Sequence, residues 1–122
     1  MEVSQTRCQT LLVITSVPDE ASAQALAQTL VTERLAACVN VLAPCGSVYR
    51  WQGRIETAQE VPLLIKTTTA RYAALEAAIR ARHPYELPEI IAVPIAHGLP
   101  DYLRWVAAET LADLTDGNSA PC

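Results

Sequence analysis

Two extended, β-prone runs meet at Gln52-Gly53, and this junction limits the possible folds more than any other feature of the chain. A pair of the type X-Gly between two such runs is typical of a two-residue β-hairpin turn. With the turn at this place, Trp51 faces Arg54 across the ladder, and Tyr49 lies on the same face as Trp51. The sequence therefore predicts a hairpin whose two strands are joined at these two residues.

The strands of this hairpin are too long for a single small globule. Runs from about residue 39 to 51 and from 54 to 66 span roughly 43 Å at about 3.3 Å per residue, whereas a chain of this length forms a globule roughly 35 Å across. The hairpin must bend, break or project, and Pro44, Gly46 and Pro62 mark where it can bend. The part beyond them is expected to pair with another copy of the chain.

The segments around the hairpin complete an alternation of strands and helices. Apolar or β-branched runs predict strands, and apolar residues at helical spacing predict helices. The sequence predicts a strand at 10–15, a helix at 21–35, the hairpin, a helix at 70–82, a buried strand at 90–95 and a last helix at 100–111. This order is the α+β, ferredoxin-like split-βαβ arrangement (βαββαβ plus a C-terminal helix) with an antiparallel sheet.

Composition indicates one domain and excludes several classes of partner. With 51% hydrophobic and 18% charged residues among 122, the chain can build one core, expected at 10–112 between an N-terminal extension at 1–9 and a flexible tail at 113–122. The formal net charge of −4 repels a phosphate backbone, so nucleic acid is not an expected partner. The apolar stretches are too short to cross a bilayer, and Glu2 does not fit a basic leader. We therefore expect a cytoplasmic protein with no membrane partner.

The cysteines do not indicate a zinc or redox site. The sequence contains four, Cys8, Cys38, Cys45 and Cys122, and none of them forms a CxxC or CxH pair. Free thiols in a reducing compartment are the preferred interpretation. Cys38 lies in an apolar predicted strand, so we expect it in the core.

The segment His83-Pro84-Tyr85-Glu86-Leu87-Pro88-Glu89-Ile90 gathers polar groups directly before a predicted strand. Proline fixes its own φ and restricts the preceding residue, so these side chains are held in a stiff elbow. His83 with Glu86 or Glu89 offers imidazole and carboxylate donors, which suit Cu(II), Zn(II) or Ni(II). The alternative for His83 is a structural role, with the ring hydrogen-bonded at the end of the preceding helix, where its charge suits the helix dipole.

No catalytic constellation stands out in the sequence. The histidines are His83 and His97, and His97 precedes a glycine in a predicted loop. Gly-x-Ser-x-Gly and glycine-rich phosphate motifs are absent, so no enzymatic activity is expected. Tyr49 and Trp51 offer aromatic faces of the kind that stack on RNA bases, but the acidic balance favours burial against a partner subunit.

Five motifs, in order along the chain, resemble those of the CutA divalent-cation tolerance proteins. They are Glu33 to Asn40, Ser47-x-Tyr49-x-Trp51-x-Gly53-x-Ile55, Ile65-Lys66-Thr67, His83 to Ile90, and Tyr102-Leu103-x-Trp105. The resemblance runs from about residue 11 to 110 and implies a ferredoxin-like subunit in a homotrimer similar in architecture to the PII signalling proteins. It also implies a role in tolerance to copper and other divalent cations, while animal members of the family are associated with anchoring acetylcholinesterase.

The resemblance further implies two candidate sites. A copper site proposed for bacterial relatives uses a cysteine and a His-His pair, whose positions here are occupied by Thr15, Arg82 and His83. A cleft between subunits would be lined by Lys66, Tyr85, Glu89, Tyr49 and Trp51. We therefore expect a homotrimeric divalent-cation (copper) tolerance protein that has no obligatory cofactor and binds Cu(II) or another divalent cation weakly. The alternatives are a PII-like sensor of a small molecule and a trimeric scaffold for another protein.

Overall fold

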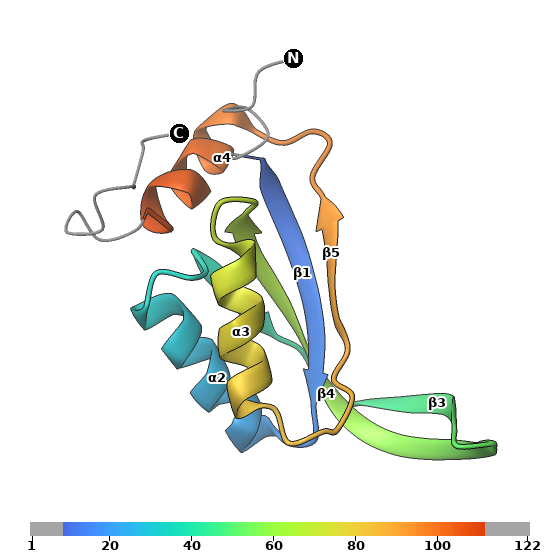
Figure 1. Cartoon of the computed structure of the whole chain (residues 1–122). Coiled ribbons are helices and arrows are strands. Elements are labelled where there is room, and N and C mark those ends of the chain that lie inside the picture. The colour runs from blue at the N-terminus through green and yellow to red at the C-terminus, as the bar shows by residue number, and fades with distance from the viewer. Residues whose placement is uncertain (1–8, 112–122) are drawn as a thin grey trace.

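The computed structural model describes residues 9–111, and within this range five strands and three helices alternate as the sequence predicts (Figure 1). The elements are β1 (Thr10–Val17), α2 (Glu20–Thr32), β2 (Cys38–Val41), β3 (Cys45–Trp51), β4 (Arg54–Thr68), α3 (Tyr72–Arg82), β5 (Ile90–Pro94) and α4 (Pro100–Glu109). The predicted extension at 1–9 and tail at 113–122 fall almost wholly outside the described residues and stay predictions. No helix within the described range is long and apolar enough to cross a membrane.

The strands form one antiparallel sheet in the order β2-β4-β1-β5, and β3 pairs with the outer half of β4. Each helix crossover joins two strands that have a third strand between them. α2 connects β1 to β2 across β4, and α3 connects β4 to β5 across β1. This is the split-βαβ arrangement, so the α+β, ferredoxin-like fold is confirmed.

The core lies between the sheet and the two long helices. α2 and α3 cover the same face of the sheet (Figure 1). Because successive side chains of a strand point to opposite faces, alternate residues of β1 and of the body half of β4, from Val61 onward, are buried under these helices. The apolar residues with no exposed surface are Val13, Ala23, Leu30, Leu63, Ile65, Leu75 and Ile79, with Val106 from α4.

The other face of the sheet, here called the open face, exposes apolar side chains. It presents Leu12, Ile14, Leu64, Ile91 and Val93, and the two residues from β5 are 48% and 46% exposed. The prediction of a buried strand at 90–95 is therefore wrong for this subunit, because among residues 9–111 β5 is an edge strand that pairs with β1 alone. The prediction that Cys38 packs in the core is also wrong. Cys38 is half-buried opposite Lys66, whereas its neighbour Val39 packs against the core.

β3 and the facing half of β4, residues 45–60, form an arm that projects from the rest of the subunit (Figure 1). At its tip, Gln52 and Gly53 adopt φ values of 49° and 81°, as a two-residue hairpin turn of the primed type requires. The predicted register is confirmed, because Trp51 pairs with Arg54 and Tyr49 pairs with Glu56. The arm bends away where β2 ends and β3 begins, and Pro44 lies in this break.

Both ends of α2 are fixed by specific hydrogen bonds. The Asp19 carboxylate accepts a hydrogen bond of 2.8 Å from the backbone N–H of Ser22, and this bond lowers the pKa of Asp19. The helix ends at Thr32 rather than at the predicted Leu35, because Arg34 takes a left-handed conformation with φ 59°. The Leu35 N–H then bonds to the Leu30 carbonyl at 2.9 Å, which closes a Schellman-type cap.

Candidate functional site

His83 caps α3 and ties the following loop to β1. Its Nε2 lies 2.7 Å from the Ser16 carbonyl oxygen, and its Nδ1 lies 3.2 Å from the backbone nitrogen of Tyr85. A carbonyl only accepts and a backbone N–H only donates, so the ring must carry its proton on Nε2 and accept at Nδ1. Both ring nitrogens are therefore occupied in the subunit, so the predicted hydrogen bonding of His83 at a helix end is confirmed, but with one ring proton His83 does not present the charge expected to suit the helix dipole.

Tyr85 packs beside His83 and reaches toward the arm. The two ring centroids are 4.8 Å apart and the ring planes are inclined by 54°. Burial of the phenol, followed by its hydrogen bond to the Glu60 carboxylate, raises the pKa of Tyr85 to about 12. The charge of Glu60 and the neighbours Tyr49 and Asp19 act in the same direction. The phenol therefore stays protonated and serves as a donor to Glu60.

Glu60 lies at the root of the arm, where β4 leaves the body. Its Oε1 accepts a hydrogen bond of 2.6 Å from Ser47 Oγ, and this contact is partly buried. Ser47 and Glu60 point to the same side of the arm, because Cys45 pairs with Glu60 and side chains two residues apart share a face. We call Ser47, Glu60, His83 and Tyr85 the arm-root cluster.

The other predicted metal ligands do not join His83 in a closed site. Glu86 and Glu89 are exposed, in the loop between α3 and β5. Among residues 9–111, no three His, Cys, Asp or Glu side chains converge so that they could hold a metal ion. His83, Glu86 and Glu89 thus offer at most an open arrangement of one imidazole and two exposed carboxylates.

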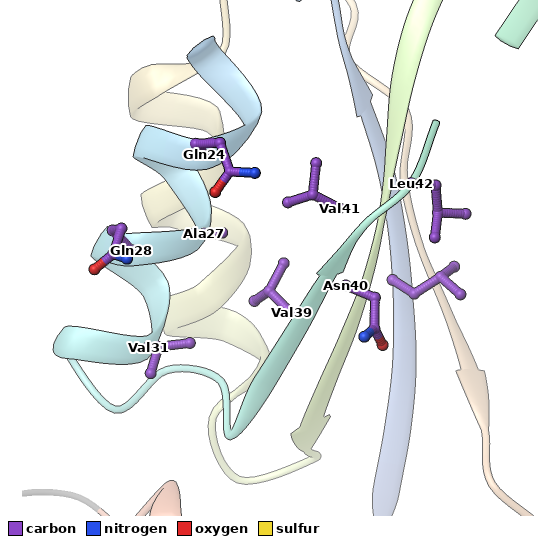
Figure 2. A pocket seen from close by; sticks show the side chains of 9 residues that line it. Gln24, Ala27, Gln28, Val31, Val39, Asn40, Val41 and Leu42 are labelled. Carbon is purple, nitrogen blue, oxygen red and sulfur yellow. The ribbon is translucent and has the colours of Figure 1, made fainter. Parts of the chain in front are cut away.

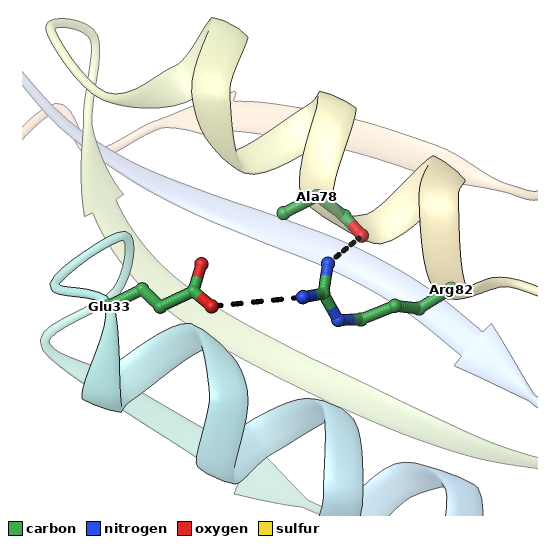
Figure 3. Close-up of polar contacts among 3 residues, drawn as sticks. All are labelled: Glu33, Ala78 and Arg82. Atoms are coloured by element: carbon green, nitrogen blue, oxygen red, sulfur yellow. Dashed lines mark hydrogen bonds and ion pairs between the residues drawn. The ribbon is translucent and has the colours of Figure 1, made fainter.

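Thr15 and Arg82, which occupy positions of the implied copper site, have other surroundings. Thr15 is fully buried, and its hydroxyl has no hydrogen-bond partner in the described part of the chain. Arg82 turns toward α2, where its Nη2 lies 3.7 Å from Glu33 Oε2 and its Nη1 donates to the Ala78 carbonyl at 3.2 Å (Figure 3). The guanidinium is thus directed at a carboxylate and a helix carbonyl on the surface.

The residues predicted to line a cleft fall into two groups. Tyr49 is near enough to influence the pKa of Tyr85, and Trp51 lies at the arm tip on the same face as Tyr49. Lys66 lies elsewhere, because its Nζ donates to Asn40 Oδ1 on the open face. Lys66 lies six steps along β4 from Glu60, which is roughly 20 Å at about 3.3 Å per residue. One subunit alone therefore does not bring Lys66 to the tyrosines.

A groove runs between α2 and the edge strand β2 (Figure 2). It has a volume of about 570 Å³ and is lined mainly by Gln24, Gln28 and Val31 from the helix and by Val39, Val41 and Leu42 from the strand segment. Within the described residues, β2 pairs only with β4, so its outer backbone edge faces this groove without a neighbouring strand. No local sequence motif indicates this groove, because a helix and an edge strand form it jointly.

The sequence pattern that defines the CutA1 divalent ion tolerance protein family matches residues 11–109. The chain belongs to this family. A CutA1 relative from Thermus thermophilus, named divalent-cation tolerance protein CutA, is 48% identical over 99 residues that cover 81% of this chain and 96% of the relative.

Solved CutA structures share the fold of this family member. CutA from Xylella fastidiosa has a TM-score of 0.81 and 48% identity over 84% of this chain and 98% of that one. A protein from Archaeoglobus fulgidus, described as a periplasmic divalent cation tolerance protein CutA, has a TM-score of 0.80 and 33% identity over 83% of this chain and 98% of that one. Divalent-cation tolerance is thus the function attached to the names of these relatives.

Ser47 and Glu60 are the members of the arm-root cluster that sequence reasoning did not assign to a site. Glu60 lies 25 residues before Tyr85 in the sequence, so no local motif joins them. A signal was present in the hairpin register, because a turn at Gln52-Gly53 places Ser47 and Glu60 on one side of the arm. The sequence did not reveal that the His83–Glu89 loop approaches that side.

Proposed function

We propose that this CutA1 family member acts in tolerance to divalent cations as a homotrimer, and that it binds Cu(II) or a similar cation weakly at His83 with Glu86 and Glu89. The role in divalent-cation tolerance is supported by membership of the family, since relatives at up to 48% identity bear the name divalent-cation tolerance protein. The second part is supported by an imidazole in a loop that also presents two exposed carboxylates, a donor set that suits Cu(II).

The arrangement around His83 explains why such binding would be weak. A cation must replace either the Ser16 carbonyl at Nε2 or the Tyr85 N–H at Nδ1 before the ring can ligate. The lost hydrogen bond is subtracted from the free energy of binding, and two exposed carboxylates lose side-chain entropy when they close on a cation. We expect affinity well below that of a preformed site with four ligands.

The proposed trimer is supported by apolar surface that the subunit leaves uncovered. On the outer side of the arm, Val48 is 72% exposed and Ile55 is 61% exposed. The open face adds Leu12, Ile14, Leu64, Ile91 and Val93. Contiguous apolar surface of this kind is typical of a protein–protein interface. A cleft between subunits is also the proposed way for Lys66 to meet Tyr49, Trp51, Tyr85 and Glu89.

Copper EPR spectroscopy tests the cation site. The thiols are first alkylated, so that Cu(II) is neither reduced nor bound by cysteine. His83→Gln removes the imidazole and keeps an amide that can donate to the Ser16 carbonyl, whereas His97→Gln removes the exposed loop imidazole. Nitrogen hyperfine splitting from an imidazole should be present in the wild type and in His97→Gln and should be lost in His83→Gln. Retention of the splitting in His83→Gln would remove His83 from the site.

The proposal places this protein in the cytoplasm and assigns it no catalytic activity and no nucleic-acid or membrane partner. Cys38 and Cys45 are free thiols, as is usual in a reducing compartment. The net charge of −4 opposes binding to nucleic acid. Fractionation of cells that express a tagged copy tests the location, and recovery with the periplasmic fraction would contradict it.

A further inference from the structure

The arm joins the body through a discontinuity in the sheet. Val41 pairs with Leu63 and Cys45 pairs with Glu60, so four steps along the first strand match three steps along β4. The extra residue makes a β-bulge, which bends a strand and increases its twist. The backbone of β4 continues through the bend, but β2 and β3 are separate strands. The bulge is therefore the point at which the arm can change direction.

Pro62 weakens the ladder at this point. The Leu42 N–H donates to the Pro62 carbonyl at 3.0 Å, so the backbone of Pro62 is directed toward β2. A strand residue directs its N–H and C=O to the same side, but proline has no N–H to return the bond. The regular ladder thus supplies less restraint at the bend than it does within the body or within the arm.

The arm-root cluster bridges this bend from the outside. On the arm, Ser47 holds the Glu60 carboxylate at 2.6 Å. From the loop after α3, the Tyr85 phenol interacts with that carboxylate, and the Tyr85 backbone N–H donates to His83. His83 in turn donates to the Ser16 carbonyl near the end of β1, where β5 has not yet begun to pair. A continuous series of contacts therefore runs from the arm to a central strand of the body.

We propose that the arm-root cluster is a latch that sets the direction of the arm relative to the body, with Tyr85 as the residue that closes it. Ser47 and Glu60 present the acceptor, and His83 positions Tyr85 and anchors it to β1. The latch pre-organises the arm, which reduces the entropy lost when a partner binds it. Its use in assembly rests on the trimer proposed above, whereas its effect on the arm itself does not.

Fluorescence anisotropy decay of Trp51 tests the latch, because Trp51 lies at the arm tip. Trp105→Phe removes the other tryptophan, and the whole chain is used in this background. Tyr85→Phe deletes the phenol oxygen that closes the latch. Tyr72→Phe is the matched control, since Tyr72 also pairs with a carboxylate, that of Glu76, but lies on α3 away from the arm.

In the parent and in Tyr72→Phe, Trp51 should rotate with the whole particle. In Tyr85→Phe, a nanosecond component should appear, since segments released from their contacts move on that timescale. Glu60→Ala should give the same component, and Glu60→Gln, which keeps an acceptor for Tyr85, should largely suppress it. Identical decays in Tyr85→Phe and Tyr72→Phe, with unchanged helical circular dichroism, would overturn the latch.

Sedimentation velocity of the same samples separates this result from the proposed trimer. Particles of single-subunit size would end the trimer proposal, while the comparison of the decays would still test the latch. Trimers with unchanged decays would end the latch and leave the trimer standing.

Discussion

The body and the arm of this CutA1 family member are stabilised in different ways, although β4 runs through both. In the body, β4 alternates between fully buried side chains such as Leu63 and Ile65 and the open face. In the arm, the same strand has no fully buried residue, and Ile55 is 61% exposed. The body is held by apolar burial, whereas the arm is held by its ladder, its turn and the contacts at its root. The body therefore has an apolar core of its own, whereas the arm presents surface suited to another molecule.

The largest expected effect is a loss of stability from a substitution in the body, compared with the same substitution in the arm. Ile65→Ala and Ile55→Ala make the same change in one strand, at a fully buried and at an exposed position. Ile65→Ala should lower the free energy of unfolding by about 2–5 kcal/mol, because it removes buried methyl groups and leaves a cavity. Ile55→Ala should cost about 0.5 kcal/mol or less within the subunit, because the Ile55 side chain is exposed there and would be covered only by a partner. Urea unfolding followed by helical circular dichroism at one chain concentration measures both, and equal losses would contradict the comparison.

A smaller effect on the free energy of unfolding is expected at Thr15, also in the body. The buried hydroxyl of Thr15 has no hydrogen-bond partner in the described part of the chain, so Thr15→Val removes an unsatisfied group at nearly constant volume. We expect a gain of about 1 kcal/mol in the free energy of unfolding. Thr57→Val, at an exposed position of the arm, is the control and should have almost no effect. A loss of stability in Thr15→Val would show that the hydroxyl has a partner in solution.

The smallest expected effect concerns pH and the root of the arm. Since folding raises the pKa of Tyr85 from 10.0 to about 12, the protonated phenol stabilises the folded state. This contribution is complete below pH 10 and is lost as the pH rises from 10 to about 12. Burial also raises the pKa of Tyr72 and Tyr102, so Tyr85→Phe should reduce the loss of stability over this interval without abolishing it. Urea midpoints at several pH values between 9 and 12 measure it, and an equally steep loss in Tyr85→Phe would rule out the contribution.

The sequence predicted those parts of the fold that depend on local signals. Gln52-Gly53 fixed the register of the arm because few residue pairs accept two positive φ values. The end of α2 was missed because the left-handed cap position, which favours glycine, is occupied by Arg34. The exposure of β5 was missed because an apolar run does not reveal whether its strand lies at an edge.

The candidate site was predicted only in part, for a related reason. The prolines around Tyr85 indicated a stiff polar elbow, and the structural role of His83 was foreseen from its place after a helix. The carbonyl that it binds, on Ser16, lies 67 residues away in the sequence. Contacts at that separation depend on the tertiary arrangement, which neither proline spacing nor helix periodicity encodes.

The association state of the wild-type chain tests the central claim about the arm most directly. Sedimentation velocity at micromolar concentration should give a particle of three subunits. Val48→Glu should shift it toward smaller particles, because it places a charge on an apolar surface that assembly would bury. Ala77→Glu adds the same charge on exposed α3 and should leave the trimer intact. A wild-type chain that sediments as a single subunit would contradict the claim that the arm is an assembly surface.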